Sequence, residues 1–130
     1  TLPADWPLSG EALSDPGNYW PIEWLRNIAY YPFAQNTWLG RPYTIIANNE
    51  PPQPLGPNTQ FTCILLLAEP DDLGNLQTKD GRIIKFYSLY PLYTEERDLE
   101  KENGLTEILK RFQLFRIKDI LDLKRENVGK

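Results

Sequence analysis

Proline and glycine interrupt the chain between residues 36 and 58 so often that no long helix or strand can form there. These breakers are Gly40, Pro42, Pro51, Pro52, Pro54, Gly56 and Pro57. Proline lacks a main-chain donor and glycine weakens regular structure, so only a short strand near residues 43–46 fits. We therefore expect a long, stiff loop, and loops of this length in compact domains are often functional.

Regular elements are predicted on both sides of this loop. Residues 21–31 are expected to form a helix, with Pro21 in its first turn and Pro32 ending it. Its apolar stripe would consist of Trp24, Leu25, Ile28 and Ala29. Residues 61–67 (FTCILLL) are almost entirely apolar, which is typical of a strand buried on both faces. Cys63 in that strand is expected to be a buried structural thiol.

The second half of the chain predicts a hairpin followed by helices. Lys79-Asp80-Gly81 is a favourable tight turn between strands over 73–78 and 83–89. Thr94 is a suitable N-cap for a charged helix over 95–102. A second amphipathic helix, packing on the sheet, is indicated by Leu105, Ile108, Leu109 and Phe112. Beyond residue 115 the pattern fits either a short helix or a terminal strand.

These elements predict one domain spanning residues 1–130, with an α+β fold and a mixed or mainly antiparallel sheet. A chain of 130 residues with 41% hydrophobic content can bury a real core. No apolar run approaches the length of a membrane span, and residues 1–6 lack the features of a signal peptide. We therefore expect a cytoplasmic protein without membrane contact.

The chain lacks most residues that enzymes use. It contains no histidine, which removes the usual general base and the commonest zinc ligand, and its single cysteine excludes an internal disulfide. No Gly-rich phosphate motif or calcium loop is present, so no cofactor or metal is expected. A net charge of −4 disfavours nucleic acid as a partner.

Charged clusters are expected to be solvated. The adjacent acids Glu95-Glu96 and Asp71-Asp72 would point apart into water rather than act as a catalytic pair. Residues 110–130 are locally basic and are likewise expected to form a solvated face. With little chemistry available, binding to another protein is the favoured function.

Several side chains near the loop suit a protein interface. Trp, Tyr and Arg are the residues most often found as interface anchors, and Trp38, Arg41 and Tyr43 lie close together in the sequence. We expect Trp38 to pack beneath the loop, and Arg41, Tyr43 and Glu50 to make the exposed contacts. A rival hypothesis is a hydrolase or transferase that uses carboxylates such as Glu50, Glu69 or Asp71.

The order of motifs resembles the suppressor of fused domain. That family has a Trp-Pro helix, an Asn-Thr-aromatic-x-Gly turn, a Pro-rich loop and an apolar strand followed by an acidic-Pro turn. The corresponding segments here are Trp20-Pro21, residues 36–40 (NTWLG), Glu50-Pro51-Pro52, residues 61–67, Glu69-Pro70-Asp71 and residues 86–93 (FYSLYPLY). Members usually carry a further N-terminal portion before a segment like Leu2-Pro3-Ala4-Asp5-Trp6. The resemblance therefore implies that this chain is the larger C-terminal part of such a domain.

The resemblance also implies partners and site residues. Animal members sequester a transcription factor by gripping an extended peptide, whereas bacterial members have been interpreted as immunity proteins against toxins. Tyr30 matches an aromatic residue facing the peptide cleft, and Glu69 matches an acid after the buried strand. Arg41 departs from the pattern, because animal members have an acid there, so an acidic partner group is favoured instead. The bacterial type is the closer match, and an immunity-type protein is the favoured interpretation, with a transcription-factor regulator as an alternative.

Overall fold

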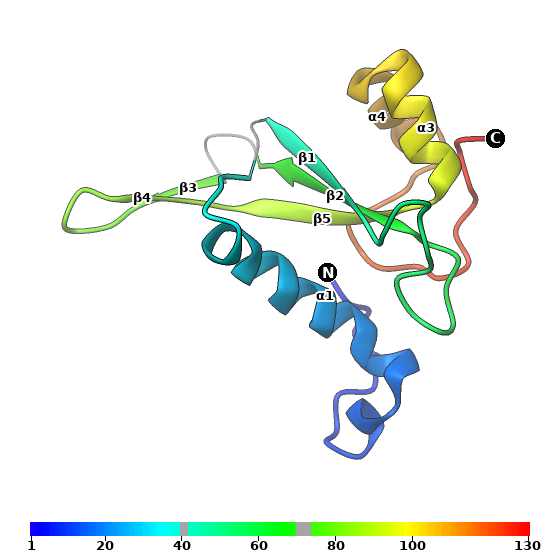
Figure 1. The fold of residues 1–130 in the computed structure, drawn as a ribbon, viewed down its shortest axis with the longest axis horizontal. Helices are drawn as coiled ribbons and strands as arrows, with labels where there is room; N and C mark the ends of the chain where they lie inside the picture. The colour runs from blue at the N-terminus through cyan, green and yellow to red at the C-terminus, as the bar shows by residue number, and fades with distance from the viewer. Residues whose placement is uncertain (40–41, 70–73) are drawn as a thin grey trace.

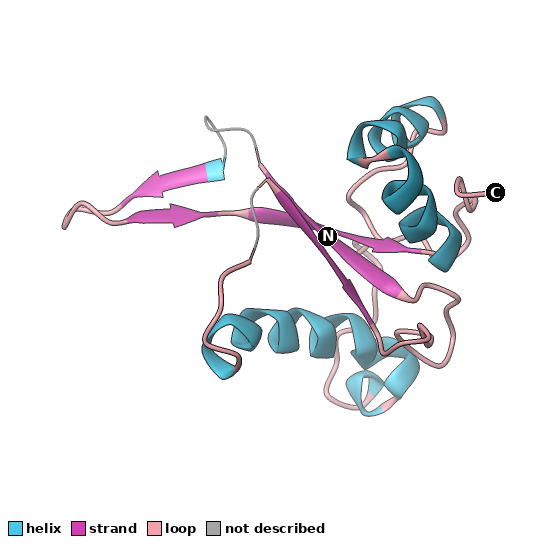
Figure 2. Ribbon diagram, turned by 45° about the horizontal axis from the view of Figure 1, so that its top comes forward, coloured by secondary structure: helices cyan, strands magenta, loops and turns pink. Residues whose placement is uncertain are grey.

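The computed structural model describes residues 1–39, 42–69 and 74–130. The fold is α+β, with a central antiparallel sheet between two helical layers (Figures 1 and 2). Its sheet has the order β1-β2-β5, and a second sheet pairs β3 with β4. The strands are β1 (Tyr43–Ala47), β2 (Cys63–Ala68), β3 (Asn75–Gln77), β4 (Ile83–Lys85) and β5 (Tyr87–Leu92). The helices are η1 (Ala12–Ser14), α1 (Pro16–Ala34), α3 (Thr94–Asn103) and α4 (Leu105–Leu114).

The central strand β2 separates two hydrophobic cores. Its residues Cys63 to Leu66 are buried, as predicted for a strand covered on both faces. Ile64 and Leu66 pack with Trp20 and Ile28 of α1. On the other face, Cys63 and Leu65 pack with Leu92, Ile108, Phe112 and Val128. The sheet therefore joins the α1 layer to the α3–α4 layer, and both of its edge strands lie between those layers.

Helix α1 begins five residues before the predicted start at Pro21. Asp15 caps the helix by accepting from the Gly17 N–H at 2.8 Å, and Pro16 occupies the favourable first position. Pro21 then lies inside the helix, where it cannot donate to the Gly17 carbonyl. The Asn58 side-chain amide supplies the missing donor at 3.1 Å. The hydrogen bond from Asn58, which is distant in the sequence, thus allows Pro21 to lie inside the helix, although proline is usually expected in the first turn.

The predicted end of α1 is also wrong, because the helix passes through Pro32 and ends at Ala34. Pro32 removes one main-chain donor from the helix, and the helix continues for only two residues after it. The predicted apolar stripe is incomplete as well. Ile28 is buried and Trp24 partly buried, whereas Leu25 and Ala29 are exposed.

The proline-rich loop packs against α1. Leu55 is buried, and its carbonyl accepts from the Trp24 indole at 2.9 Å. The Trp20 indole donates to the Asn58 side chain at 3.0 Å, and a Cβ at Gly56 would lie 2.3 Å from the Trp20 ring. This part of the loop is therefore a packing element of its own domain.

The predicted hairpin is confirmed at its turn as the β3–β4 pair, which projects from the sheet (Figure 1). Residues 87–89 of its predicted second strand instead belong to β5 and pair with β2. Gly81 has a φ of 85°, the left-handed conformation that a tight turn requires and that glycine adopts freely. Exposed apolar side chains lie along this arm at Leu76, Ile83 and Ile84. Leu73, in the predicted first strand, lies outside the described residues.

Helices α3 and α4 match their predicted ranges closely, but their caps differ. The N-cap of α3 is Tyr93 rather than Thr94, and the Tyr93 N–H donates to the Glu96 carboxylate at 3.0 Å. Helix α4 ends in a Schellman motif, in which Ile117 N–H bonds Phe112 C=O at 2.8 Å and Arg116 N–H bonds Gln113 C=O at 3.2 Å. Arg116 occupies the left-handed position, with a φ of 54°, that glycine usually takes.

The C-terminal tail, predicted as a short helix or strand, is neither beyond residue 116. It returns along α3 (Figure 1), and a buried ion pair is among the contacts that hold it there. Glu96 is fully buried, and both its oxygens accept from the Arg125 guanidinium at 2.6 Å. Arg125 also lies over the rings of Phe61, Tyr93 and Phe112. The expectation of solvated charges is therefore wrong for both Glu96 and Arg125, because each is the buried partner of the other.

Candidate functional site

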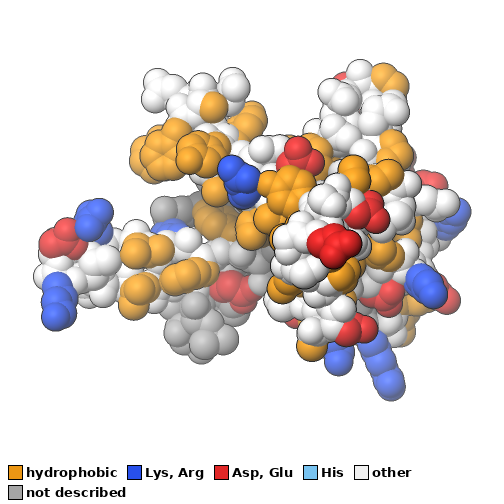
Figure 3. Space-filling view, turned by 90° about the horizontal axis from the view of Figure 1, so that it is seen from below, with side chains coloured by type: hydrophobic (Ala, Val, Ile, Leu, Met, Phe, Trp, Pro, Cys, Tyr) orange, Lys and Arg blue, Asp and Glu red, His pale blue; other side chains and the backbone are white. Residues whose placement is uncertain are grey.

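Three exposed aromatic side chains define a surface at the C-terminal end of α1, which we call the aromatic end: Tyr30, Phe33 and Trp38. Their exposed fractions are 69%, 84% and 93%. The prediction that Trp38 packs beneath the loop is therefore wrong. Figure 3 shows hydrophobic side chains gathered on this end of the molecule and along the neighbouring hairpin. Large exposed apolar patches on a folded domain mark interaction sites.

Strand β1 follows the aromatic end and forms one edge of the sheet. The Ala68 N–H bonds the Pro42 carbonyl and the Asn48 N–H bonds the Thr62 carbonyl, so even-numbered residues of β1 face β2. The main-chain groups of Tyr43, Ile45 and Ala47 consequently point away from the sheet. An outward row of this kind can pair with an added strand.

Two predicted site residues, Tyr43 and Glu50, line an open hollow of about 560 Å³ between β1 and α3. The Tyr43 hydroxyl donates to Glu100 at 2.6 Å, and this hydrogen bond raises the Tyr43 pKa. Glu50 accepts from the Arg97 guanidinium at 3.1 Å. Both side chains are thus tied to α3, beside the β1 edge.

Glu69 lies elsewhere, one residue beyond the end of β2. Its carboxylate accepts from the Ser88 hydroxyl on β5, and its N–H donates to the Phe86 carbonyl at 3.2 Å. It is therefore associated with the β5 side of the sheet. Arg41, the remaining predicted site residue, lies outside the described residues.

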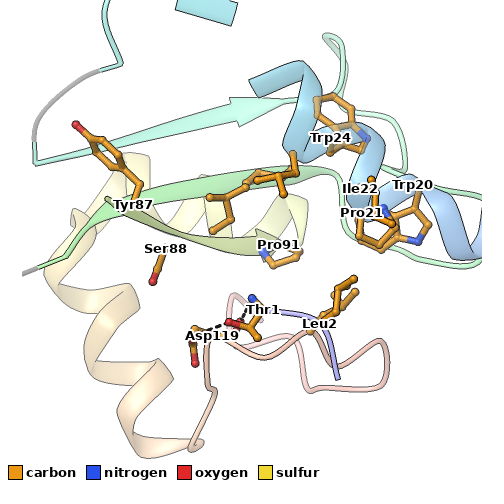
Figure 4. A pocket seen from close by; sticks show the side chains of 14 residues that line it. Thr1, Leu2, Trp20, Pro21, Ile22, Trp24, Tyr87, Ser88, Pro91 and Asp119 are labelled. Atoms are coloured by element: carbon orange, nitrogen blue, oxygen red, sulfur yellow. Dashed lines mark hydrogen bonds between the residues drawn. The ribbon is translucent and has the colours of Figure 1, made fainter. Parts of the chain in front are cut away.

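A groove of about 300 Å³ lies between α1 and β5 (Figure 4). Trp24 and Leu25 of α1 contribute one wall, and Ile64 and Leu89 contribute apolar surface from the sheet. Ser88 and Asp119 give it a polar side. The sequence reasoning missed this groove, because the prediction of a continuous apolar stripe on α1 implied a filled interface with the sheet.

The described residues offer little catalytic chemistry. They contain no group of three or more acidic, histidine or cysteine side chains able to hold a metal ion. Of the rival carboxylates, Glu50 and Glu69 are not brought together, since Glu50 belongs to the hollow at α3 and Glu69 to the β5 side. Asp71 lies outside the described residues. Among the helices that are described, none has both the length and the apolar character needed to span a bilayer.

The structure thus divides the predicted site among three places: the aromatic end, the hollow beside β1, and the start of β5. Phe33 was missed as a site residue, although its position next to Pro32 at a predicted helix end was a usable signal. Trp38 was included as a contact residue but was expected to be buried.

Comparison with protein families gives a match to the model described as suppressor of fused protein (SUFU), over residues 1–126. Neither curated protein sequences nor solved structures give a match.

Proposed function

The chain belongs to the suppressor of fused family, and on that premise we propose that it is a non-catalytic domain that binds and sequesters a partner protein. The family is generally non-catalytic and consists of protein-interaction domains. A stoichiometric inhibitor of a toxin, acting in a bacterial cytoplasm as an immunity-type protein, is the form of this function that we favour.

The observation that carries the proposal is the exposure of the aromatic end. Phe33 and Trp38 are 84% and 93% exposed and lie close together in the sequence, Phe33 in the last turn of α1 and Trp38 just after the helix. Burying a large aromatic side chain contributes more than most residues to binding, and such residues are frequent hot spots. Exposing both to water has no benefit for folding, whereas covering them by a partner would stabilise a complex.

The β1 edge provides a complementary way to hold the same partner. Its outward main-chain groups at Tyr43, Ile45 and Ala47 supply affinity without sequence selectivity. Selectivity would then come from side chains, namely Tyr30 and Trp38 of the aromatic end and Glu50 beside β1. Arg41 would add a preference for an acidic partner group.

The test is co-expression with the product of the adjacent gene, followed by purification and mass measurement of a stoichiometric complex. The double variant Phe33→Ala/Trp38→Ala should weaken that complex about 30-fold or more, because hot-spot truncations cost roughly 2 kcal/mol or more. Leu114→Ala/Phe115→Ala is the matched control, since these residues are 75% and 49% exposed at the end of α4. Equal affinity of both double variants would contradict the assignment of the aromatic end.

The two main interpretations differ in their response to carboxylate substitution. A sequestering protein retains its protective effect when Glu50, Glu69 and Asp71 are all replaced by the matching amides, apart from a modest loss of affinity. A carboxylate-dependent hydrolase or transferase loses its activity completely. Retention of partner binding together with loss of protection would favour the enzyme.

A further inference from the structure

Residues 117–130, the tail, contact the domain through a short segment around Arg125. The Arg125 guanidinium donates to both oxygens of the buried Glu96 carboxylate at 2.6 Å, and it lies 4.9, 5.0 and 5.4 Å from three aromatic ring centres. A two-pronged carboxylate and aromatic faces are the groups that recognise a guanidinium best. We call this cage and its neighbouring acid the tail site, which consists of Glu95, Glu96, Phe61, Tyr93 and Phe112.

The residues that follow this arginine fit the same site as an extended peptide. The Val128 N–H donates to Glu96 at 3.1 Å, and the Val128 carbonyl accepts from Arg111 at 2.6 Å. The Val128 side chain is buried in the core on the α4 side of the sheet. A Cβ at Gly129 would lie 2.3 Å from the Glu95 main chain, so only glycine fits there. The tail site therefore matches an Arg-x-x-Val-Gly sequence.

Regular secondary structure does not join the tail to the rest of the domain. Within the described residues, the tail contributes no strand to either sheet and contains no helix. Main-chain bonds also link Asp119 and Leu121 of the tail to Thr1. An identical segment from another molecule could form all of these contacts. The tail can therefore be replaced without unfolding a helix or a strand.

The connection between α4 and the tail is held in a conformation that its residues do not favour. Arg116 has a φ of 54°, in the left-handed region that suits glycine and disfavours other residues. The Arg116 and Ile117 N–H groups bond the carbonyls of Gln113 and Phe112, respectively. If α4 continued as a helix, the same two donors would bond the same two carbonyls in the opposite pairing. Straightening this turn thus loses no main-chain hydrogen bond.

The sequence after α4 also favours a helix over the observed turn. Residues 105–128 contain neither proline nor glycine, and residues 115–126 (FRIKDILDLKRE) are rich in arginine, lysine, leucine and glutamate. These residue types are good helix formers. The turn at Arg116 is therefore maintained by the binding of the tail to the tail site. Hinges that are strained in the closed form promote the exchange of segments between copies.

A second copy of the chain is the occupant that matches the tail site best. Its tail carries the same Arg-x-x-Val-Gly motif, so every contact of the tail can form between two chains. Exchange also relieves the left-handed turn at Arg116 in both copies. A tail attached to its own domain has an effective concentration in the millimolar range, so exchange requires a comparable protein concentration.

We propose that two copies of this chain exchange residues 117–130, so that Arg125 of each copy enters the tail site of the other. Helix α4 continues through Arg116 in the exchanged dimer and serves as the hinge. This contact joins identical copies and does not involve the aromatic end. It can be present or absent independently of the proposed function.

The contact between Asn127 and Glu95 reports which chain supplies the tail. The Asn127 amide donates to the Glu95 carboxylate at 2.9 Å, and Glu95 is exposed. Full-length Glu95→Cys and Asn127→Cys chains are mixed at about 1 mM, incubated and treated with a short bis-maleimide. Exchange should give a covalent heterodimer on a denaturing gel, whereas closed monomers cannot be linked. Glu95→Cys chains alone are the matched control, which also tests for reaction of the buried Cys63.

The double variant Glu95→Cys/Asn127→Cys gives a second readout from a single chain. Gel filtration separates its monomer from its dimer before the crosslinker is added. The monomer should be linked within one chain, because its own tail fills the tail site. The dimer should be linked between two chains, because each tail has moved to the other copy.

Two substitutions at the hinge provide a test that needs no crosslinker. Arg116→Gly and Arg116→Ala remove the same charge, so they differ only in their main-chain preference. Glycine suits the closed turn, whereas alanine favours the continued helix. Sedimentation should therefore give a dimerisation constant about tenfold or more higher for Arg116→Ala than for Arg116→Gly.

Several results would overturn the proposal. A heterodimer yield no greater than that of Glu95→Cys chains alone would exclude exchange. Links confined to single chains in a gel-filtration dimer would show that closed copies associate through another surface. Equal dimerisation of the two Arg116 variants would exclude the hinge. Loss of the link within the monomer when another protein is added, with no dimer formed, would assign the tail site to that protein instead.

Discussion

Removing the Arg125 side chain should destabilise this domain severely, because it leaves the Glu96 carboxylate buried without a cation. Glu96 is fully buried, and only 10% of the Arg125 side chain is exposed. Breaking such a pair from one side typically costs about 3–5 kcal/mol, since the remaining charge keeps its desolvation penalty. The total stability of a domain is about 5–15 kcal/mol, so Arg125→Ala should remove about a fifth or more of it.

Urea unfolding followed by tryptophan fluorescence measures this effect. With a denaturant slope of roughly 1–3 kcal/mol per molar, the midpoint should fall by about 2 M. The matched control is Arg82→Ala, which breaks an ion pair of 2.8 Å between side chains that are 79% and 58% exposed. Water and salt screen that pair, so its midpoint should not change measurably.

A double variant separates the cost of an orphaned charge from the value of the pair. Glu96→Leu/Arg125→Met replaces both charges by apolar groups of similar size, and it should recover much of the stability lost in Arg125→Ala. The reasoning is refuted if Arg125→Ala behaves like Arg82→Ala. It is also refuted if the double variant is as unstable as the sum of the two single variants.

Three further predictions test other parts of the fold. Trp38→Ala should change unfolding stability by no more than about 0.5 kcal/mol, whereas Trp20→Ala, at a residue only 3% exposed, should cost about 3–5 kcal/mol in the same urea assay. Arg116→Gly should raise thermal stability by about 0.5–1 kcal/mol, because glycine suits the left-handed cap that Arg116 occupies; an unchanged melting temperature would contradict this. Burial raises the Cys63 pKa, so the thiol stays neutral in the folded protein. The stability that this neutral thiol contributes should be lost as the pH rises above the pKa of the unfolded state, near 9. Urea midpoints at pH 7.5 and 10, compared with those of Cys63→Ala, would show this loss. Rapid reaction of the native thiol at pH 8 would contradict that burial.

Elements defined by neighbouring residues could be predicted from the sequence. The hairpin follows from Asp80-Gly81, whose conformational preference does not depend on the rest of the molecule. Strand β2 follows from an apolar run of strand length, which is typical of a strand covered on both faces. The order of the motifs, which resembles that of a known family, added the expectation of a protein-binding domain. Single residues do not give that expectation.

Features that depend on distant partners could not be predicted. Local rules place Pro21 at a helix start, but Asn58, 41 residues from Gly17, replaces the missing hydrogen bond. In the same way, Glu96 and Arg125 lie 29 residues apart in the sequence. Glutamate and arginine are usually exposed, so neither residue alone indicates a buried ion pair. Trp38 shows the reverse error, because aromatic character favours burial and nothing in its immediate sequence indicates 93% exposure.

The position of Arg125 after α4 in the sequence has a consequence for folding during synthesis. Every element of both cores precedes it except the tail itself, so a nascent chain can form the sheet and α3 before residue 125 has been made. Until then, closing α3 onto the sheet buries the Glu96 carboxylate without its cation, at a cost comparable to that estimated for Arg125→Ala. The closing contact therefore cannot form until residue 125 has been synthesised, so the domain should complete its fold only after both cores are present in the nascent chain.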